Sequence, residues 1–436
     1  MKFYNRELEL GLLRKNWDKS QHHSVMTTVM GRRRVGKTSL LLRSVEGIEN
    51  LYLYVSKDNE QMLCRKFQEQ AASALGIEIH GQTTRISEMF ETLMRHGIHH
   101  RYTLIIDEFQ NFLSINNAIP SHIQDIWDRY KDSTHINLIL CGSIYSMMHK
   151  IFDNGDAPLY GRRDSHLRLL PFSIATLKTI LHDHHADYRP DDLLCLYMLT
   201  GGVAKYVELL MDNGAVTKQR MLHYALSADS PFLTEGTEIL LSEFGRDYGT
   251  YFSILQLIAG GMTTQAEIDS VIAKNTGAYL NNLYEDYTFV SKSTPLLNKV
   301  GSRNIRWHIN DPFLRFWFRF VYPYQGLVES NQIGMLRQYV ADNYSQFSGR
   351  TLELYFQELY MQSGRFTHVG NWWDRRGENE IELLALNEFN KTGVIAEVKR
   401  NANKLNIETL SAKVAALPSE FSRYQFPLRL LSLEDM

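Results

Sequence analysis

An eight-residue motif near the start of the chain has the composition of a phosphate-binding loop. Positions 31–38 read Gly-Arg-Arg-Arg-Val-Gly-Lys-Thr, which matches the pattern G-x-x-x-x-G-K-S/T between an apolar strand and an amphipathic helix. The two glycines let the backbone turn tightly, so that its N–H groups face an anion, and the following helix adds positive potential. The motif therefore predicts a site for the phosphates of a nucleotide.

Each part of this loop has an expected role. Lys37 is expected to reach the β- and γ-phosphates, and the hydroxyl of Thr38 is expected to bind Mg²⁺. The nucleotide site is expected to comprise Gly31, Arg32, Arg33, Arg34, Val35, Gly36, Lys37, Thr38 and Ser39.

A second apolar run, 103–107, ends in the two carboxylates Asp107 and Glu108. Ligands of parallel sheets bind beyond the carboxyl ends of the strands, so we expect both acids to lie beside the loop. Asp107 would hold Mg²⁺ through its water shell, and Glu108 would act as the general base that polarises the attacking water. With one further strand, 50–55, between the two motifs, the pattern is typical of ATPases that use a catalytic glutamate.

Two further candidates follow the next strands. Ser143 comes after the run 137–141 and either contacts the γ-phosphate or its water, or forms an ordinary turn. Arg162 and Arg163 lie in a short loop, and an arginine suits the charge of a reacting phosphate because its planar group is always ionised. The sequence leaves open whether either arginine acts on its own nucleotide, on that of a neighbouring subunit, or in a surface salt bridge.

Carboxylates also alternate along two expected strands near the C-terminus, 380–386 and 393–399. The period of two places Glu380 and Glu382 on one face, and Glu397 and Lys399 on one face. Carboxylates that converge beside a lysine can bind Mg²⁺ and activate water for phosphodiester cleavage. Alternating acids are also typical of a solvated face, and both interpretations remain open.

The elements that must position these residues divide the chain into five segments. Short apolar runs alternate with helical stretches at 25–30, 50–55, 103–107, 137–141 and 166–170, which predicts a parallel α/β sheet. We expect a P-loop core at 1–171, a helical lid at 172–235, a winged helix at 236–310, an aromatic-rich connector at 311–344 and a C-terminal α/β domain at 345–436. The aromatic run 313–320 is expected to pack in a core between domains rather than to stack on bases.

The expected winged helix has a mixed charge pattern. Thr264 and Glu267 form a capping box, and strands at 289–299 and 303–310 would make the wing. The second helix carries Asn281, Asn282, Glu285 and Asp286, whose acids would repel phosphate. The wing carries Lys292, Lys299, Arg303 and Arg306, which could contact a nucleic-acid backbone. DNA binding and protein binding both remain open for this segment.

Composition narrows the class of protein further. Of the 436 residues 44% are hydrophobic and 22% charged, and no apolar run approaches the about 18 residues that span a bilayer, so we expect a soluble protein with no membrane partner. The three cysteines lack metal-ligand spacing and the first residues lack the apolar core of a signal peptide, which favours the cytoplasm. A formal net charge of −2 gives no general attraction for nucleic acid, so any such contact needs a local patch.

Several motifs together resemble the archaeal-type AAA+ ATPases, which also occur in bacteria. They are 3–10, the loop with its three arginines, 106–110, Gly142-Ser143, Tyr160-Gly161-Arg162 and Gly201-Gly202. The resemblance covers nearly the whole chain and implies ATP as the nucleotide, adenine contacts from Asn5 and Arg6, a helical lid, and a winged helix like that of origin-recognition relatives. In that family a hydrophobic residue and a proline usually follow the second glycine, whereas this chain has Val203-Ala204.

The last segment resembles the PD-(D/E)xK nuclease fold. In that comparison Glu382 takes the place of the usual aspartate, Glu397 and Lys399 supply the E-x-K element, and Glu353 matches the acid on the first helix. The resemblance implies a magnesium site on the three glutamates, with Lys399 as a catalytic residue. The change from aspartate to glutamate at 382 lengthens one ligand by a methylene, which shifts the metal or marks a degenerate site.

Two hypotheses follow for the function. In the first, ATP hydrolysis drives an enzyme whose C-terminal domain cuts or grips double-stranded DNA. In the second, the chain is a nucleotide-dependent regulatory switch whose C-terminal domain is an inactive module that binds protein or DNA. A homo-oligomer and a separate protein partner are compatible with both.

Overall fold

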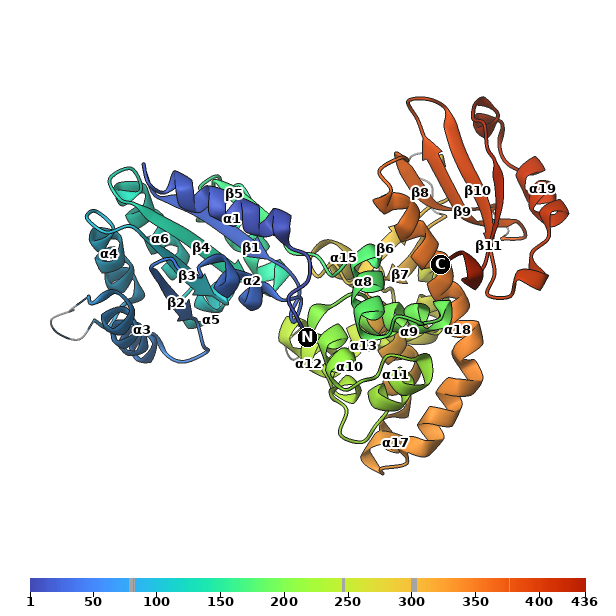
Figure 1. Cartoon of the computed structure of the whole chain (residues 1–436), viewed down its shortest axis with the longest axis horizontal. Helices are drawn as coiled ribbons and strands as arrows, with labels where there is room; N and C mark the ends of the chain where they lie inside the picture. The colour runs from blue at the N-terminus through green and yellow to red at the C-terminus, as the bar shows by residue number, and fades with distance from the viewer. Residues whose placement is uncertain (78–80, 82, 245–247, 299–303, 376) are drawn as a thin grey trace. The chain divides into compact units, whose positions relative to one another are not determined.

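The computed structural model describes residues 1–77, 81, 83–244, 248–298, 304–375 and 377–436 (Figure 1). Lys299 and Arg303 of the expected wing lie outside these described residues. The chain forms two compact units, Tyr4–Pro171 and a second one made of Met1–Phe3 and Phe172–Met436. No helix within the described ranges is both long and apolar enough to cross a membrane.

The unit Tyr4–Pro171 is built on a five-stranded parallel sheet. Its strands follow the order β2-β3-β4-β1-β5. They are β1 (Val25–Met30), β2 (Asn50–Tyr54), β3 (Tyr102–Asp107), β4 (Ile136–Gly142) and β5 (Ser165–Arg168). Every residue of β1, β3 and β4 is buried, as expected for parallel strands with both faces covered. The predicted parallel α/β fold is therefore confirmed.

Helices cover both faces of this sheet. One face packs Val29, Ile105 and Ile139 against α1 (Glu7–Lys19) and α2 (Lys37–Ser44). The other face packs Leu104, Ile106 and Leu138 against the remaining helices of the unit. These are α3 (Glu60–Leu75), α4 (Ile86–His96), α5 (Phe112–Ile115), α6 (Ile119–Tyr130) and α7 (Tyr145–Phe152), with the short turn η1 (Phe109–Asn111) before α5. Neighbouring residues of β3 thus face opposite cores, as side-chain alternation requires.

Strand register brings the sequence motifs to one edge of the sheet. Met30 of β1 pairs with Gly142 of β4, and Ile106 of β3 pairs with Leu140 of β4. The P-loop, Ser143 and the acidic pair therefore follow the carboxyl ends of three adjacent strands. In the sheet, β4 lies between β1, which precedes the P-loop, and β3, which carries the acidic pair. In the sequence β2 comes between them, but in the sheet it lies at the edge.

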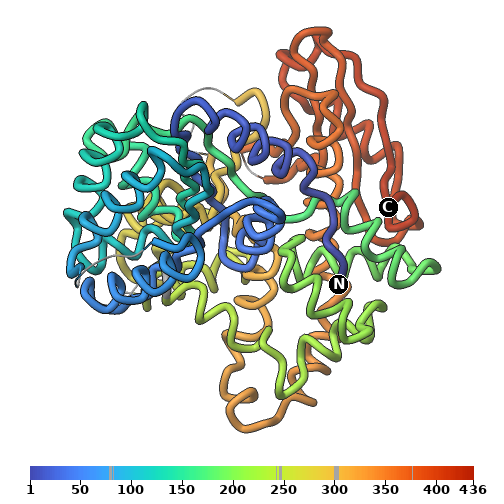
Figure 2. The backbone as a smooth tube through the Cα atoms, turned by 60° about the vertical axis from the view of Figure 1, so that its left-hand side comes forward, coloured from blue at the N-terminus to red at the C-terminus, as the bar shows by residue number. Residues whose placement is uncertain are grey.

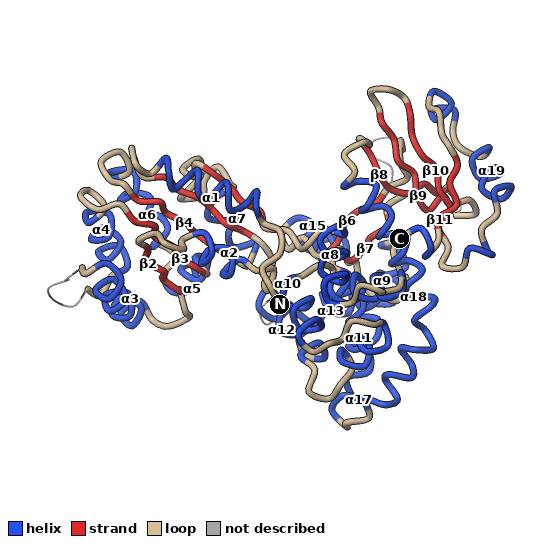
Figure 3. The backbone as a smooth tube through the Cα atoms, viewed as in Figure 1, coloured by secondary structure: helices blue, strands red, loops and turns tan. Residues whose placement is uncertain are grey.

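After Pro171 the second unit begins with a run of helices (Figure 3). They are α8 (Ile174–His184), α9 (Pro190–Thr200), α10 (Ala204–Asp212) and α11 (Lys218–Ala225), followed by the short turn η2 (Pro231–Leu233). The first residues of the chain pack beside these helices, as Figure 2 shows, with the amino group of Met1 2.7 Å from Asp212 and Lys2 2.8 Å from Asp183.

Four more helices and a two-stranded hairpin follow. They are α12 (Glu235–Phe244), α13 (Tyr248–Ala259), α14 (Gln265–Ile272), α15 (Gly277–Glu285), β6 (Val290–Ser293) and β7 (Arg306–Ile309). The predicted capping box is present at α14, where Thr264 and Glu267 bond to each other's backbone N–H. Strands β6 and β7 pair antiparallel, and we call this hairpin with its connecting residues the wing.

The aromatic run forms a packed core. It comprises α16 (Pro312–Phe316), a π-helical turn (Trp317–Val321) and the turn η4 (Tyr322–Tyr324), before α17 (Gln325–Glu329). The indole of Trp317 is fully buried, donates to the carbonyl oxygen of Leu233 at 3.0 Å and lies edge-on to Phe252. The next helix, α18 (Ile333–Gln362), is 30 residues long and runs unbroken through position 345, where the sequence suggested a domain boundary.

A four-stranded mixed sheet completes the chain. Strands β8 (His368–Trp373), β9 (Glu380–Asn387) and β10 (Thr392–Val398) form an antiparallel meander, and β11 (Leu428–Leu431) pairs parallel to β10. Between β10 and β11 lie η5 (Ala402–Lys404), α19 (Ile407–Ala415) and η6 (Ser419–Arg423), and η7 (Leu433–Asp435) follows β11. From α18 onward the order is helix, three strands, helix, strand, and β8 was not expected from the sequence.

Candidate functional site

The phosphate-binding loop joins β1 to α2 through a tight turn. Arg34 and Gly36 have left-handed backbones, with φ of 68° and 100°. A Cβ atom on Gly31 would lie 2.6 Å from the carbonyl oxygen of Leu169, so this close approach requires glycine. Val35 is buried in the core below the loop, whereas Thr38 and Ser39 are exposed at the start of α2. The loop thus has the shape of an anion cradle at a helix N-terminus.

Lys37 is held within this loop. Its Nζ donates to the carbonyl oxygens of Gly31 at 2.8 Å and Arg32 at 3.1 Å, and the residue is 7% exposed. A phosphate oxygen placed against the loop would compete with these carbonyls for the same ammonium protons. The position fits the role expected for this lysine.

Asp107 lies beside the P-loop threonine. Its Oδ2 accepts hydrogen bonds from the hydroxyls of Thr38 at 3.2 Å and Tyr52 at 2.5 Å. Burial, together with the bond to Asp107, raises the pKa of Tyr52, so the phenol stays protonated and remains a donor. An adjacent hydroxyl and carboxylate fit the ligand chemistry of hydrated Mg²⁺. Tyr52 was not singled out from the sequence, although a tyrosine between two buried leucines of β2 offered a signal.

Glu108 faces the end of the neighbouring strand. Its φ of 55° is left-handed, which is uncommon for a residue with a side chain and turns the carboxylate away from Asp107. Its Oε2 accepts from the hydroxyl of Ser143 at 2.7 Å and from the amide of the buried Gln110. The structure therefore brings together Glu108 and Ser143, which the sequence placed after different strands.

The segment expected to contact adenine lies at the same edge of the sheet. Asn5 and Arg6 have left-handed backbones, with φ of 56° and 85°. The guanidinium of Arg6 donates to the carbonyl oxygen of Leu170 at 2.7 Å and pairs with Glu9 at 3.0 Å. Leu169, the residue before Leu170, lies close to Gly31. Asn5 and Arg6 are therefore close to the P-loop.

Arg162 and Arg163 lie near the amino ends of the strands, away from the P-loop. They precede β5, and Asp164 accepts a hydrogen bond at 2.8 Å from the N–H of Met26 at the start of β1. Arg162 pairs with Asp128 of α6 at 2.9 Å, and Arg163 pairs with Asp153 at 2.6 Å. The six residues of β1, about 20 Å of extended chain, separate this end of the sheet from the loop. The structure does not bring either arginine to the phosphate site of its own chain.

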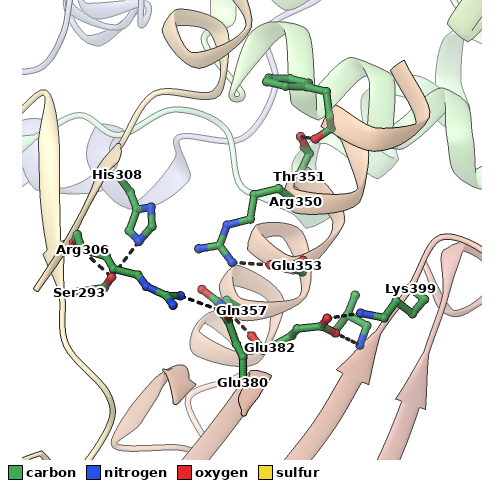
Figure 4. Close-up of polar contacts among 12 residues, drawn as sticks. Ser293, Arg306, His308, Arg350, Thr351, Glu353, Gln357, Glu380, Glu382 and Lys399 are labelled. Carbon is green, nitrogen blue, oxygen red and sulfur yellow. Dashed lines mark hydrogen bonds and ion pairs between the residues drawn. The ribbon is translucent and has the colours of Figure 1, made fainter. Parts of the chain in front are cut away.

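The C-terminal carboxylates gather around Glu382 of β9 (Figure 4). Glu382 is 9% exposed, accepts from the N–H of Val398 at 2.6 Å and forms an ion pair with Lys399. Glu397 of β10 lies 3.3 Å from Lys399 and 2.7 Å from Lys413. Burial raises the pKa of Glu382, and the nearby charge of Glu353 raises it further. The expected residues thus share one neighbourhood.

Each of these carboxylates is paired with a cation. Glu353 pairs with Arg350 on the same face of α18, while Lys399 lies between Glu382 and Glu397. Burial opposes the charge of Lys399, but the two carboxylates outweigh it and raise its pKa. Across the described part of the chain, no group of three or more His, Cys, Asp or Glu side chains could hold a metal ion. Each of the three expected ligands therefore lies in an ion pair with an arginine or a lysine.

The fold and the first site define a class of protein. A parallel sheet with a P-loop after β1 and an acidic pair after β3 is that of a P-loop ATPase. Residues 3–210 match the model of a family described as "ATPase domain predominantly from Archaea". Residues 317–410 match a model described as "Archaea bacterial proteins of unknown function". Residues 3–210 are therefore similar to an archaeal-type, ATP-binding ATPase domain, and residues 317–410 to that second family.

The chain is also similar to individual proteins. An uncharacterized protein of Methanocaldococcus jannaschii is 29% identical over 411 residues, which cover 91% of this chain and 87% of the relative. A Walker-type ATPase of Pyrococcus abyssi shares the fold with a TM-score of 0.54 and 20% identity, over 72% of this chain and 96% of that one. The ORC2 protein of Aeropyrum pernix, solved in ADPNP–ADP complexes, aligns with a TM-score of 0.49 and 17% identity, over 78% and 96%.

Proposed function

We propose that this chain hydrolyses ATP with Mg²⁺ at the P-loop and thereby controls a C-terminal domain that acts on double-stranded DNA. The observation that carries the first part is the convergence of three strand ends. Lys37 and Thr38 follow β1, Asp107 ends β3 and Glu108 follows it, and Ser143 follows β4. These residues supply the groups that phosphoryl transfer to water requires.

In this proposal each side chain has a distinct task. Lys37 and the loop N–H groups bind the phosphates, while Thr38 and Asp107 hold the Mg²⁺ that neutralises charge on the β- and γ-phosphate oxygens. Glu108 accepts a proton from the attacking water, and the hydroxyl of Ser143, 2.7 Å away, orients its carboxylate. Asn5 and Arg6 place the N-terminal segment beside the base.

Nucleotide binding tests the site assignment. Lys37→Ala is expected to abolish binding of a fluorescent ATP analogue, because the ammonium that compensates phosphate charge is lost. Arg43→Ala is the matched control, since Arg43 lies on the same helix and pairs with Glu46 on the surface. Wild-type affinity in Lys37→Ala would refute the site.

The C-terminal part of the proposal rests on topology and on chemistry together. The order helix, three strands, helix, strand resembles that of PD-(D/E)xK nucleases, and Glu382, Glu397 and Lys399 come from adjacent strands β9 and β10. We expect Mg²⁺-dependent nicking of duplex DNA that Lys399→Ala abolishes. Lys391→Ala, on the exposed turn between the same two strands, is expected to leave nicking unchanged.

The ion pairs around the carboxylates favour a second candidate function, a switch whose C-terminal domain binds DNA or protein without cutting. Each acid already has a cation, and the described residues contain no metal cluster. ATP turnover that duplex DNA stimulates, without nicking in Mg²⁺ or Mn²⁺, would favour this DNA-binding switch. Turnover that no nucleic acid affects, together with absent nicking, would exclude a role on DNA.

Arg162 is proposed to act on the nucleotide of a second copy of the chain. It lies at the far edge of its own sheet, on the surface, where it is held by Asp128. A neighbouring subunit could bring its own phosphate site to this edge.

A further inference from the structure

The wing is attached to the C-terminal sheet. The N–H of Leu296 donates to the carbonyl oxygen of Asn371 in β8 at 3.2 Å, and the indole N–H of Trp373 donates to Asn304 at 2.9 Å. The guanidinium of Arg306 lies 4.3 Å from the ring centre of Trp373 and pairs with Glu380 of β9 at 2.9 Å. These contacts place a cation of β7 beside the strand that carries Glu382.

A second cation faces the wing from α18. Figure 4 shows Arg350 between His308 of β7 and the carboxylate of Glu353. Burial, followed by the charges of Arg350, Arg306 and Arg315, lowers the pKa of His308 to about 3. The imidazole is therefore neutral, and three guanidiniums lie near enough to act on it.

The same arginines border the carboxylate site. Glu380 and Glu382 project from the same face of β9, because side chains alternate along a strand. The amide of Gln357, one turn beyond Glu353 on α18, donates to the carbonyl oxygen of Glu382 at 2.8 Å. The side chains of Arg306, Arg350 and Lys399 remain 22%, 30% and 36% exposed, so a ligand can reach all three.

We propose that Arg306 and Arg350 bind nucleic-acid phosphates next to the phosphate that lies at Glu382 and Lys399. The wing and the last domain then form one composite nucleic-acid site, and the wing does not bind nucleic acid alone. A planar guanidinium binds phosphate through two parallel hydrogen bonds, and a phosphate can replace Glu380 or Glu353 as its partner. This inference rests on the proposed role of the last domain on DNA.

The ion pair between Arg306 and Glu380 allows a sharp test. If the pair only attaches the wing, then removing either partner should weaken nucleic-acid binding alike. If Arg306 binds phosphate, the two substitutions should act in opposite directions, because Glu380 competes with the phosphate for the guanidinium.

Fluorescence anisotropy of a labelled DNA duplex, titrated with the full chain over a salt series in Ca²⁺, provides the measurement. Arg306→Ala and Arg350→Ala are each expected to weaken binding about 10-fold and to lower the slope of log K against log salt by about 1. Glu380→Gln is expected to tighten binding, and Arg306→Lys to retain part of it. Arg65→Ala, which breaks an exposed pair with Glu69 on α3, is the control and should bind as wild type.

Two results would overturn the inference while leaving a role on DNA intact. One is equal weakening by Arg306→Ala and Glu380→Gln, and the other is wild-type affinity and salt slope in both arginine variants. A wild-type chain that binds neither duplex DNA nor duplex RNA would overturn the inference and the proposed role of the last domain together. Preference for the RNA duplex, with the same arginine effects, would support the composite site and change its substrate.

Discussion

Asp107 and Glu108 are neighbours in the chain but serve different partners. Asp107 ends β3 and meets the hydroxyls of Thr38 and Tyr52. The backbone of Glu108 is left-handed, so its carboxylate turns toward Ser143 beyond β4. The two neighbouring carboxylates thus have different partners, Thr38 for Asp107 and Ser143 for Glu108.

Glu108→Gln is expected to separate binding from hydrolysis. The amide keeps the size and hydrogen-bonding capacity of the side chain but cannot accept the proton, so ATP turnover should fall by about 100-fold or more. ATP affinity should stay within about 2-fold of wild type, which corresponds to a change in binding free energy of less than about 0.5 kcal/mol. Turnover at the wild-type rate would remove Glu108 from the role of base, and Glu46→Gln, on the surface after α2, serves as the control.

His308 is expected to make the second unit sensitive to acid. Its pKa falls from the ordinary 6.5 to about 3 in the folded chain, so the unfolded chain binds this proton more tightly. Stability from this residue is therefore complete above about pH 6.5 and is lost as the pH falls toward 3, with about 2 kcal/mol lost at about pH 5. Urea unfolding at about pH 7.5 and pH 5 measures this loss. His308→Asn should reduce the difference between the two values, and an unreduced difference would contradict the assignment.

The two sites differ in how far the sequence predicts them. The P-loop and the acids after β3 were predictable, because short spacing and strand ends fix their positions. Tyr52 and Arg350 were not identified as site residues, because their roles depend on which strands and helices become neighbours. Arg306 was expected only as a wing residue that could contact a nucleic-acid backbone, not as a neighbour of Glu380. Arg350 offered one local signal, since it lies three residues before Glu353 and therefore on the same helical face.

At the level of elements, the glycine pair after α9 sets a close approach between two backbones. Gly202 has φ of 76°, and a Cβ atom there would lie 2.3 Å from the carbonyl oxygen of Phe172. Gly214 also has a left-handed backbone, with φ of 63°, but a Cβ atom there would meet nothing within 4 Å. An alanine would therefore have a strained left-handed backbone at both positions, but it would clash with a neighbouring atom only at position 202.

Gly202→Ala is expected to destabilise the second unit more than Gly214→Ala. The strain of a left-handed alanine costs about 1–2 kcal/mol at both positions. The clash with Phe172 should add about 1–3 kcal/mol at position 202 alone. Thermal unfolding of the two variants measures the difference, and equal losses would show that Phe172 moves aside freely.

Elements were predictable where hydrophobic pattern and local signals agreed. Strands β1, β3 and β4 are continuous apolar runs, and the capping box fixed the start of α14. Strand β8 was missed because Gly370 and Asn371 interrupt its pattern, and the register shifts at that point. The continuity of α18 was missed because the aromatic-rich connector was expected to end at 344, whereas one helix runs through this position and the Ser348 hydroxyl bonds back to the carbonyl oxygen of Tyr344 at 2.5 Å within it.

At the scale of the molecule, a half-buried aspartate helps to unite the second unit. Asp191 of α9 pairs with Lys218 of α11 at 2.8 Å and with Arg400, next to Lys399, at 2.9 Å. It also accepts a hydrogen bond at 2.9 Å from the phenol of Tyr344 in α18. The helices after Phe172 are therefore linked directly to the strand that carries Glu397.

The proposed action of Arg162 on a second copy predicts complementation between variants. Lys37→Ala removes the phosphate site, and Arg162→Ala removes the residue that a neighbour would use, so each alone should lose most ATP turnover. A mixture of the two should regain turnover, because mixed pairs contain one intact site with one intact arginine. Measuring turnover across mixing ratios tests this, and a mixture no faster than its components would contradict action between copies.

The length of α18 has a consequence for chains of this kind. Its 30 residues extend about 45 Å, and Tyr344 contacts α9 before Gln357 meets the last sheet. Inserting one residue between these contacts would rotate the second set by about 100° relative to the first and shift it by about 1.5 Å. We therefore expect related chains to change the length of this helix only in steps that preserve its phase, such as about seven residues, or two turns.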